Sequence, residues 1–121
     1  MNKPTLVIGA SSNPQKYSHM AVMLLQDKGH TVIPSHPTEK AIGDLKVVND
    51  LADIKSPLDT ISVYVRPEIL KGMADKILAL KPARVIFNPG TEDTELSQKF
   101  LKAGIKVMDA CTLVMLKTGQ Y

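Results

Sequence analysis

Residues 5–25 read TLVIGASSNPQKYSHMAVMLL, in which an apolar run, a turn-rich loop and an amphipathic pattern follow one another. The run from Thr5 to Gly9 is short and apolar, which is typical of a buried strand. After the loop, apolar residues recur at a spacing that lines one helical face: Tyr17, Met20, Ala21, Leu24 and Leu25. A buried strand that leads through a loop into a helix is the first half of a βαβ unit.

The same alternation of strand and helix continues to the end of the chain. Further short strands are predicted at residues 31–33, 59–65, 83–87 and 105–108. One helix is predicted from Pro67 to residue 80, and a second begins at a cap formed by Thr91, with Leu96, Phe100 and Leu101 turned inward. One or two final helical turns are predicted over residues 111–117. Residues 38–57 are the least regular part, with an extended piece at 46–48 and a helical turn at 51–54.

Strands that alternate with amphipathic helices require right-handed crossovers and a parallel sheet covered on both faces. We therefore predict an α/β fold, a Rossmann-like, doubly wound sheet of about five parallel strands with helices on both faces. A chain of 121 residues has the size of one domain, so residues 1–121 are expected to form a single Rossmann-like domain.

The composition narrows the class of protein and its partners. Hydrophobic residues make up 44% of the chain and charged residues 22%, which argues against disorder. The 15 Lys and Arg residues exceed the 12 Asp and Glu residues by a net charge of only +3 and form no run, so no nucleic acid partner is expected. One cysteine favours a reducing compartment, and the N-terminal apolar stretch is too short for a signal peptide or a membrane span. We expect a cytoplasmic protein without a membrane partner, either a monomer or a homodimer.

The positions of the acidic residues indicate which loop at the ligand-binding edge of the sheet is best suited to bind an anion. Ligands of an open parallel sheet bind beyond the carboxyl ends of its strands, where a helix N-terminus attracts anions unless the protein's own carboxylates occupy it. The later helices begin with acids, at Glu68 and at residues 92–95, whereas the first helix has none as far as Asp27. The sequence therefore predicts that the first strand–helix loop binds phosphate. Its residues are Gly9, Ala10, Ser11, Ser12 and Lys16.

This loop has one glycine, so it matches neither the three-glycine dinucleotide fingerprint nor a P-loop. Its hydroxyl groups, backbone N–H groups and Lys16 are suited to a phosphate all the same. In the alternative interpretation, Ser11, Ser12 and Asn13 only form a turn and cap the helix.

The end of the second strand bears on the kind of nucleotide. Proteins that bind NAD usually place an acid there for the ribose hydroxyls. Here the strand runs into Pro34-Ser35-His36-Pro37, with no acid until Glu39. Ser35 and His36 tolerate a phosphorylated ribose better than a free diol, which leaves NADP or coenzyme A. Alternatively, the two prolines stiffen a loop in which His36 is simply exposed.

Several short motifs stand in a fixed order along nearly the whole chain. They are Gly9-Ala10-Ser11, Lys16-Tyr17-Ser18, Pro34-Ser35-His36-Pro37, Ile42-Gly43, Pro57-Leu58-Asp59, Arg66-Pro67-Glu68, Asn88-Pro89-Gly90 and Asp109-Ala110-Cys111. This ordered set resembles the small stand-alone CoA-binding domain family, whose Rossmann-like fold is shared with the CoA-binding domain of succinyl-CoA synthetases. Two residues depart from the family pattern: His36 replaces an asparagine and Asn88 replaces a glutamine.

The resemblance implies a coenzyme A or acyl-CoA ligand that lies across the carboxyl edge of the sheet. On this basis Ser11, Ser12 and Lys16 are expected to hold the pyrophosphate. The adenosine and its 3′-phosphate are assigned to Ser35, His36 and Arg66, and the pantetheine arm to Asn88, Gly90 and Cys111.

No catalytic residue and no metal site is predicted. The three histidines lack metal-ligand spacing, and no His–acid pair supports a nucleophile. Cys111 is a candidate for thiol exchange with the ligand, since a helix N-terminus lowers a thiol pKa. Alternatively, Cys111 is an inert buried cysteine. The neighbouring Asp109 would either raise the thiol pKa or cap the helix. We expect a nucleotide-binding protein rather than an enzyme. The alternatives are an NADP-binding oxidoreductase-like domain and a regulatory protein-interaction module.

Overall fold

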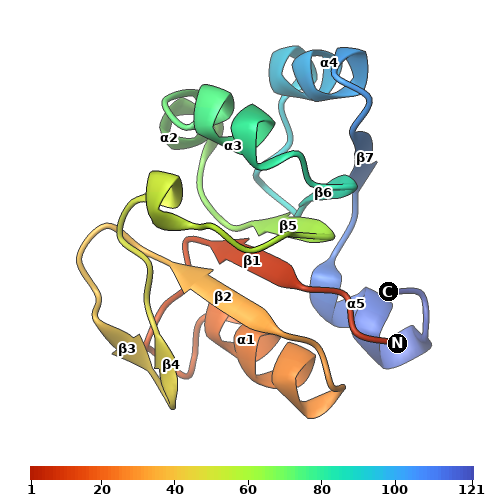
Figure 1. Cartoon of the computed structure of the whole chain (residues 1–121). Helices are drawn as coiled ribbons and strands as arrows, with labels where there is room; N and C mark the ends of the chain where they lie inside the picture. The colour runs from red at the N-terminus through yellow and green to blue at the C-terminus, as the bar shows by residue number, and fades with distance from the viewer.

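The computed structural model describes residues 1–121 and contains one five-stranded parallel sheet (Figure 1). The strand order across the sheet is β2-β1-β5-β6-β7, and every neighbouring pair is parallel. The strands are β1 (Thr5–Ile8), β2 (Val32–Ser35), β5 (Thr60–Val63), β6 (Arg84–Phe87) and β7 (Lys106–Asp109). The predicted Rossmann-like α/β fold is confirmed.

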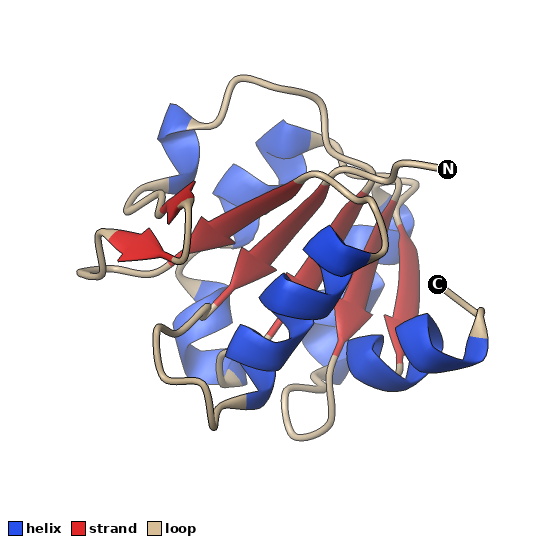
Figure 2. Cartoon of the chain, turned by 90° about the horizontal axis from the view of Figure 1, so that it is seen from below, coloured by secondary structure: helices blue, strands red, loops and turns tan.

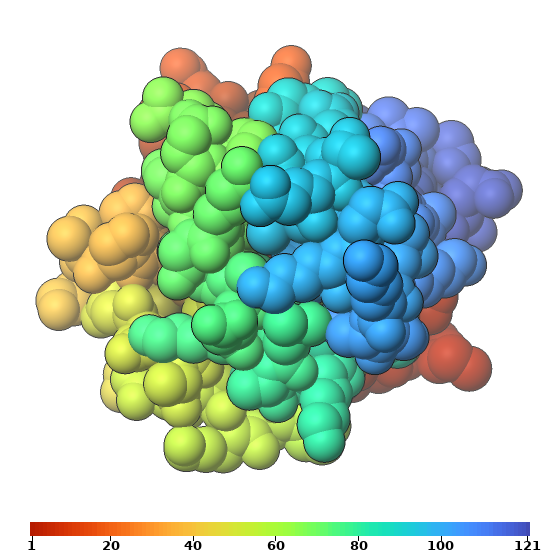
Figure 3. Space-filling view, turned by 90° about the horizontal axis from the view of Figure 1, so that it is seen from above, coloured from red at the N-terminus to blue at the C-terminus, as the bar shows by residue number.

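Helices cover both faces of this sheet (Figures 1 and 2). One face carries α1 (Tyr17–Asp27) and α5 (Thr112–Thr118), which pack against each other. The other face carries the 3₁₀ turn η1 (Leu51–Asp53), α2 (Pro67–Lys71), α3 (Ala74–Leu80) and α4 (Thr94–Lys102). Figure 3 shows this second face, where the green residues of α2 and α3 lie beside the blue residues of α4.

The central strands are buried over their whole length, which explains why most of their residues are apolar; the buried polar residues among them are Thr5, Thr60, Ser62 and Arg84. Their side chains alternate between two cores, so that Leu6 and Ile8 pack under α2, α3 and α4 while Val7 packs under α1. Burial of one such side chain stabilises the fold by roughly 1.5–3 kcal/mol. The strand order reverses between β1 and β5, and the loops that follow these two strands therefore diverge and leave a crevice.

The region predicted to be irregular contains a small antiparallel hairpin, β3 (Ala41–Ile42) and β4 (Leu45–Lys46), turned at Gly43. Val48 continues the chain in an isolated parallel bridge to Ser35. The predicted helical turn is present as η1, with Asp50 accepting a hydrogen bond from the N–H of Ala52. None of the helices has the length and apolar character that crossing a membrane requires.

The predicted buried face of α1 was right for Ala21 and Leu25 but wrong for Tyr17 and Met20. Tyr17 is 71% exposed and Met20 is 39% exposed, whereas the buried residues are Ser18, Ala21, Val22 and Leu25. These four have the i, i+3, i+4, i+7 spacing of a helix stripe, but a serine stands at its first position. Because serine is polar, the apolar pattern alone selected the neighbouring stripe.

The predicted single helix over residues 67–80 is two helices, broken between Lys71 and Ala74. The predicted strand end at Pro34 was also wrong, because this residue lies inside β2. Proline is tolerated there since β2 is the edge strand, and its carbonyl still accepts a hydrogen bond from the N–H of Val48.

Two predictions about α4 were wrong as well. Its N-cap is Asp93, whose carboxylate accepts a hydrogen bond from the N–H of Leu96 at 2.9 Å. Thr91 is buried instead, and its hydroxyl donates to the carbonyl of Asn88. Leu101, expected to point inward, is 48% exposed.

Candidate functional site

A cavity of about 550 Å³ opens where the strand order reverses, beyond the carboxyl ends of β1, β2 and β5. We call it the switch-point cavity. Its walls come from the strand ends and from η1, α2 and α3. They comprise Ile8, Gly9, Ser35, His36, Pro37, Asn49, Asp50, Leu51, Tyr64, Val65, Arg66, Ile69, Gly72, Met73 and Lys76.

A second cavity, of about 380 Å³, lies at the start of α1, and we call it the helix-entrance cavity. It is lined by Gly9, Ser11, Lys16, Tyr17, Ser18, His36 and Tyr64. Three of these residues, Gly9, His36 and Tyr64, also line the switch-point cavity. The two cavities are therefore neighbours, separated by residues that they share.

Gly9 allows the loop after β1 to pass close to the end of β5. Its φ is +87°, and a Cβ at this position would lie 2.8 Å from Cγ1 of Val65 and 3.1 Å from the carbonyl oxygen of Tyr64. Only glycine fits this backbone without strain. The N–H groups of Gly9 and Ala10 both donate to the carbonyl of Ser35 at 3.0 Å, so they stabilise the fold and do not face a ligand.

The start of α1 has unpaired hydrogen-bond donors. The backbone N–H groups of Tyr17, Ser18 and His19 have no acceptor, no side chain caps the helix, and its first turn contains no acid. Ser18 is only 6% exposed, yet its hydroxyl has no hydrogen-bond partner within the protein. Lys16 stands at the N-cap, is exposed and forms no ion pair. These groups together favour an anion.

The preceding loop also forms the turn that the alternative interpretation predicted. The Ser11 hydroxyl accepts a hydrogen bond from the N–H of Asn13, and the Asn13 side chain accepts one from the N–H of Gln15. Neither side chain reaches the first turn of α1, so the turn shapes the loop without capping the helix.

The sequence has no acid between Gly9 and Asp27, but the fold brings one to this loop from another segment. The carboxylate of Glu39 accepts a hydrogen bond from the N–H of Ser12 at 2.9 Å and a second, short one from the Ser12 hydroxyl. These hydrogen bonds hold the pKa of Glu39 below its usual range. Ser12 lines neither cavity, and its two donors are engaged by this carboxylate.

His36 has a fixed tautomer at the boundary between the cavities. Its Nδ1 accepts hydrogen bonds from the N–H groups of Thr38 and Glu39, each at 3.1 Å. Since Nδ1 acts as an acceptor, the ring proton lies on Nε2. An asparagine makes the same kind of turn, with its side-chain oxygen as the acceptor and its amide as the donor. His36 therefore retains the turn chemistry of the residue that it replaces.

Asn88 is 1% exposed, and its side chain is fully used inside the fold. Its Nδ2 donates to the Ser62 hydroxyl and to the carbonyl of Val63, and its Oδ1 accepts from the N–H of Thr112 at 2.8 Å. The expected role at the pantetheine arm is therefore not supported by the position of this side chain, which ties β5, β6 and α5 together.

Gly90 and Cys111 also line neither of the two cavities. The N–H of Gly90 donates to the Glu92 carboxylate at 3.0 Å. Cys111 is the half-buried N-cap of α5. Asp109 does not cap this helix, since no side-chain hydrogen bond is made there. No three His, Cys, Asp or Glu side chains lie close enough together to hold a metal ion.

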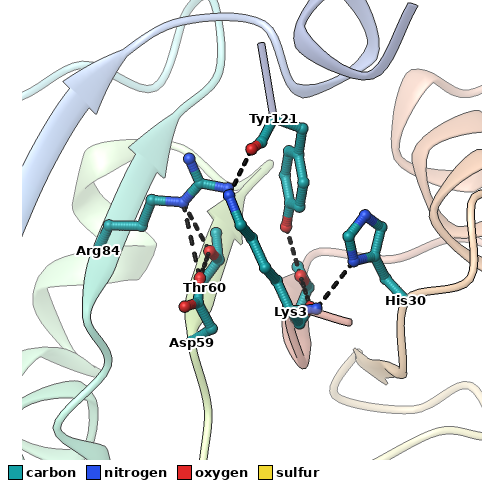
Figure 4. A network of polar contacts seen from close by, with 7 residues as sticks. Lys3, His30, Asp59, Thr60, Arg84 and Tyr121 are labelled. Atoms are coloured by element: carbon teal, nitrogen blue, oxygen red, sulfur yellow. Dashed lines mark hydrogen bonds and ion pairs between the residues drawn. The ribbon is translucent and has the colours of Figure 1, made fainter. Parts of the chain in front are cut away.

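A second polar network lies at the opposite edge of the sheet, around the first residues of the strands (Figure 4). Arg84 donates to the Thr60 hydroxyl at 2.7 Å, and its guanidinium carbon lies 4.4 Å from the ring centre of Tyr121. Lys3 donates through Nζ to the backbone oxygen of Tyr121, and its N–H donates to His30. This network stabilises the chain ends and takes no part in the candidate site.

A model of the CoA binding domain matches residues 3–117. The chain belongs to this CoA-binding domain family. The uncharacterized protein YneT of Bacillus subtilis (strain 168) is 34% identical over 115 residues, which cover 93% of this chain and 84% of YneT. The crystal structure of an uncharacterized protein has a TM-score of 0.95 at 36% identity, over 100% of this chain and 99% of that one. The cell-free ID.343 structure from Thermus thermophilus has a TM-score of 0.89 at 27% identity, over 98% of this chain and 90% of that one.

The structure places only some of the predicted site residues at the two cavities. Those that line the cavities are Gly9, Ser11, Lys16, Ser35, His36 and Arg66, and those that do not are Ala10, Ser12, Asn88, Gly90 and Cys111. Ser35 is only 5% exposed, so little of it is accessible from its cavity.

The sequence analysis missed Tyr64, which lines both cavities of this CoA-binding domain. Its hydroxyl is buried without a hydrogen-bond partner, and burial, followed by the nearby Cys111, raises the pKa of Tyr64. Tyr64 directly follows β5, but the strand predicted at residues 59–65 included it, so it was not counted among the loop residues. Asp50 and Lys76 were missed too; they form a 2.8 Å ion pair that joins η1 to α3 in the cavity wall.

Proposed function

We propose that this CoA-binding domain binds coenzyme A or an acyl-CoA, with the pyrophosphate at the start of α1 and the adenosine in the switch-point cavity. The observation that carries the proposal is the set of unpaired donors in the helix-entrance cavity. Three backbone N–H groups and the hydroxyl of the largely buried Ser18 have no acceptor of their own, and Lys16 adds an unpaired positive charge.

The chemistry of these donors fits a phosphate group. Backbone N–H groups at a helix start bind phosphate oxygens, and the helix dipole favours their negative charge. Hydrogen bonds to a charged acceptor stabilise a complex by about 1.5–3 kcal/mol each. We therefore assign the pyrophosphate to Lys16, Tyr17 and Ser18, with Ser11 beside them. Ser12 is left out because Glu39 engages it.

The neighbouring cavity suits the nucleoside. Its volume of about 550 Å³ lies within the range of small-molecule pockets. Leu51, Ile69 and Met73 supply apolar wall against which a flat ring can pack, and Nε2 of His36 supplies a donor for a ring nitrogen or a ribose oxygen. These features match what adenosine requires.

Arg66 is the candidate for the 3′-phosphate of the ligand. Its side chain is 76% exposed, and Nε lies 4.0 Å from the Glu68 carboxylate, a loose surface contact. A guanidinium so weakly held can turn to form two parallel hydrogen bonds with a phosphate. NADP also carries a pyrophosphate and a ribose phosphate, and the same residues serve it in the alternative assignment.

Isothermal titration with coenzyme A, dephospho-CoA and NADPH tests the proposal. We expect coenzyme A to bind, and to bind more tightly than dephospho-CoA because Arg66 loses its phosphate partner in the latter. Tighter binding of NADPH than of coenzyme A would select the NADP alternative. No measurable heat with any of the three at high protein concentration would contradict a nucleotide-binding function. Native mass spectrometry of freshly purified protein adds a check for a co-purified adduct of coenzyme A mass.

A further inference from the structure

Glu39 binds Ser12 as an oxyanion ligand would. One carboxylate oxygen accepts from the backbone N–H at 2.9 Å and the other from the hydroxyl, which is a two-point contact with an N–H and an O–H of the same residue. The two residues are 27 positions apart, and the contact joins the loop after β1 to the segment after β2. The loop therefore already binds an anion, and that anion belongs to the protein.

The backbone that carries Glu39 is held from two sides. Nδ1 of His36 accepts from the N–H of Glu39, and Nδ2 of Asn49 donates to the carbonyls of both His36 and Glu39. The side chain itself has no other partner, since neither of its oxygens meets a lysine or an arginine. A fixed backbone with a side chain held only at Ser12 allows the carboxylate to leave without unfolding the segment.

The position of Glu39 matters because Ser12 directly follows Ser11, which lines the helix-entrance cavity. His36, in the same turn as Glu39, lines both cavities. A pyrophosphate at the start of α1 would bring two negative charges into the neighbourhood of this carboxylate. Like charges repel, and the hydrogen-bond donors of Ser12 would become available to the ligand once Glu39 had left.

We infer that Glu39 is a built-in competitor of the phosphate ligand, which occupies Ser12 in the unliganded protein and is displaced when a pyrophosphate binds. This inference rests on the proposed function. Glu39 then lowers the affinity of the protein for the ligand, compared with the same loop without this carboxylate. In addition, residues 36–40 respond when the ligand binds at the loop of residues 10–13.

The test compares wild-type protein with Glu39→Gln and Glu39→Ala, titrated with coenzyme A and with inorganic pyrophosphate. We expect both variants to bind each ligand about 2- to 5-fold more tightly than wild type, since an interaction between exposed charges has an effect of this size. Asp44→Asn removes one negative charge from the turn of the β3–β4 hairpin, where Asp44 is exposed and forms no ion pair. This control should leave both affinities unchanged, and thermal melting checks that every variant is folded.

A second readout follows the Ser12 amide by NMR. In wild type, added pyrophosphate should shift this signal, because the amide exchanges the Glu39 carboxylate for a ligand oxygen, and Glu39→Ala should shift it without any ligand. Unchanged or weaker binding in both Glu39 variants, or an equal gain in Asp44→Asn, would overturn the inference while leaving the proposed function intact. Absence of binding in wild type and in every variant would instead contradict the proposed function. Binding by the Glu39 variants alone would support both.

Discussion

A Cβ atom at Gly9 would lie 2.8 Å from Cγ1 of Val65, so the first loop of this protein touches the end of β5 with no space for a side chain. Val65 and Gly9 both line the switch-point cavity. The close approach of these residues thus shapes the place where the ligand is proposed to bind.

Gly9→Ala is predicted to lower the free energy of unfolding by about 2–4 kcal/mol, from the positive φ together with the overlap. Gly104→Ala is the matched control, because Gly104 has φ +85° but open space around the new Cβ. The control should lose only about 1 kcal/mol. Denaturant unfolding of both variants measures the difference, and equal losses would show that the contact with Val65 has no energetic effect.

Asn88→Ala is predicted to destabilise the protein by about 2–4 kcal/mol, because the buried N–H of Thr112 and the carbonyl of Val63 lose a partner. Asn13→Ala also removes one side-chain hydrogen bond, but at an exposed position. It should change the free energy of unfolding by less than about 1 kcal/mol. Chemical denaturation distinguishes them, and a mild effect of Asn88→Ala would mean that water replaces its hydrogen bonds.

Lys16→Ala is predicted to weaken binding of coenzyme A about 2- to 5-fold, since the variant loses an exposed, unpaired cation next to the pyrophosphate. The effect should decrease as the salt concentration rises. Lys28→Ala, at the other end of the same helix, should bind as wild type does. Titration at low and high salt provides the measurement. Equal effects of the two substitutions would show that only the net charge matters.

The two replacements of His36 are predicted to differ. His36→Asn should keep both the turn and the affinity for coenzyme A, because the amide group supplies an acceptor and a donor. His36→Ala should weaken binding and leave the N–H groups of Thr38 and Glu39 without their acceptor. Titration of both variants gives the comparison, and loss of binding in His36→Asn would assign a role to the imidazole ring itself.

Stability is predicted to depend on His30. Burial lowers the pKa of His30 from 6.5, and the positive charges of Lys3 and Arg84 lower it further. The folded state therefore disfavours the protonated ring, so stability is lost as the pH falls below 6.5 through the lowered pKa of the folded state. Unfolding of wild type and His30→Gln between pH 7 and pH 5 checks this, and an unchanged slope in the variant would assign the pH dependence to other groups.

The sheet was predictable because its central strands are short and mostly apolar and turn-forming residues separate them. The side of α1 that is buried was not, since a serine stands on the buried stripe and a tyrosine on the exposed one. Thr91 and Asp93 are both good capping residues, and only the fold decides which of them reaches the first turn of α4. Local patterns define elements, whereas these choices depend on what the elements pack against.

The candidate site was predictable to the extent that it depends on loop positions. The residues after β1, β2 and β5 had to meet at one edge of a parallel sheet. The contact between Glu39 and Ser12 depends on how the segment after β2 folds back over 27 positions, and the burial of Asn88 depends on a partner 24 positions away in α5. Local sequence patterns therefore predict neither of these two contacts.

The most direct test of the proposed site observes the backbone N–H groups of Tyr17, Ser18 and His19 by NMR while coenzyme A is added. The proposal predicts that these three signals shift most, and that Ser18→Ala weakens binding about 10-fold. Saturable binding that leaves the three signals in place and shifts residues elsewhere would contradict the assignment of the pyrophosphate to the start of α1.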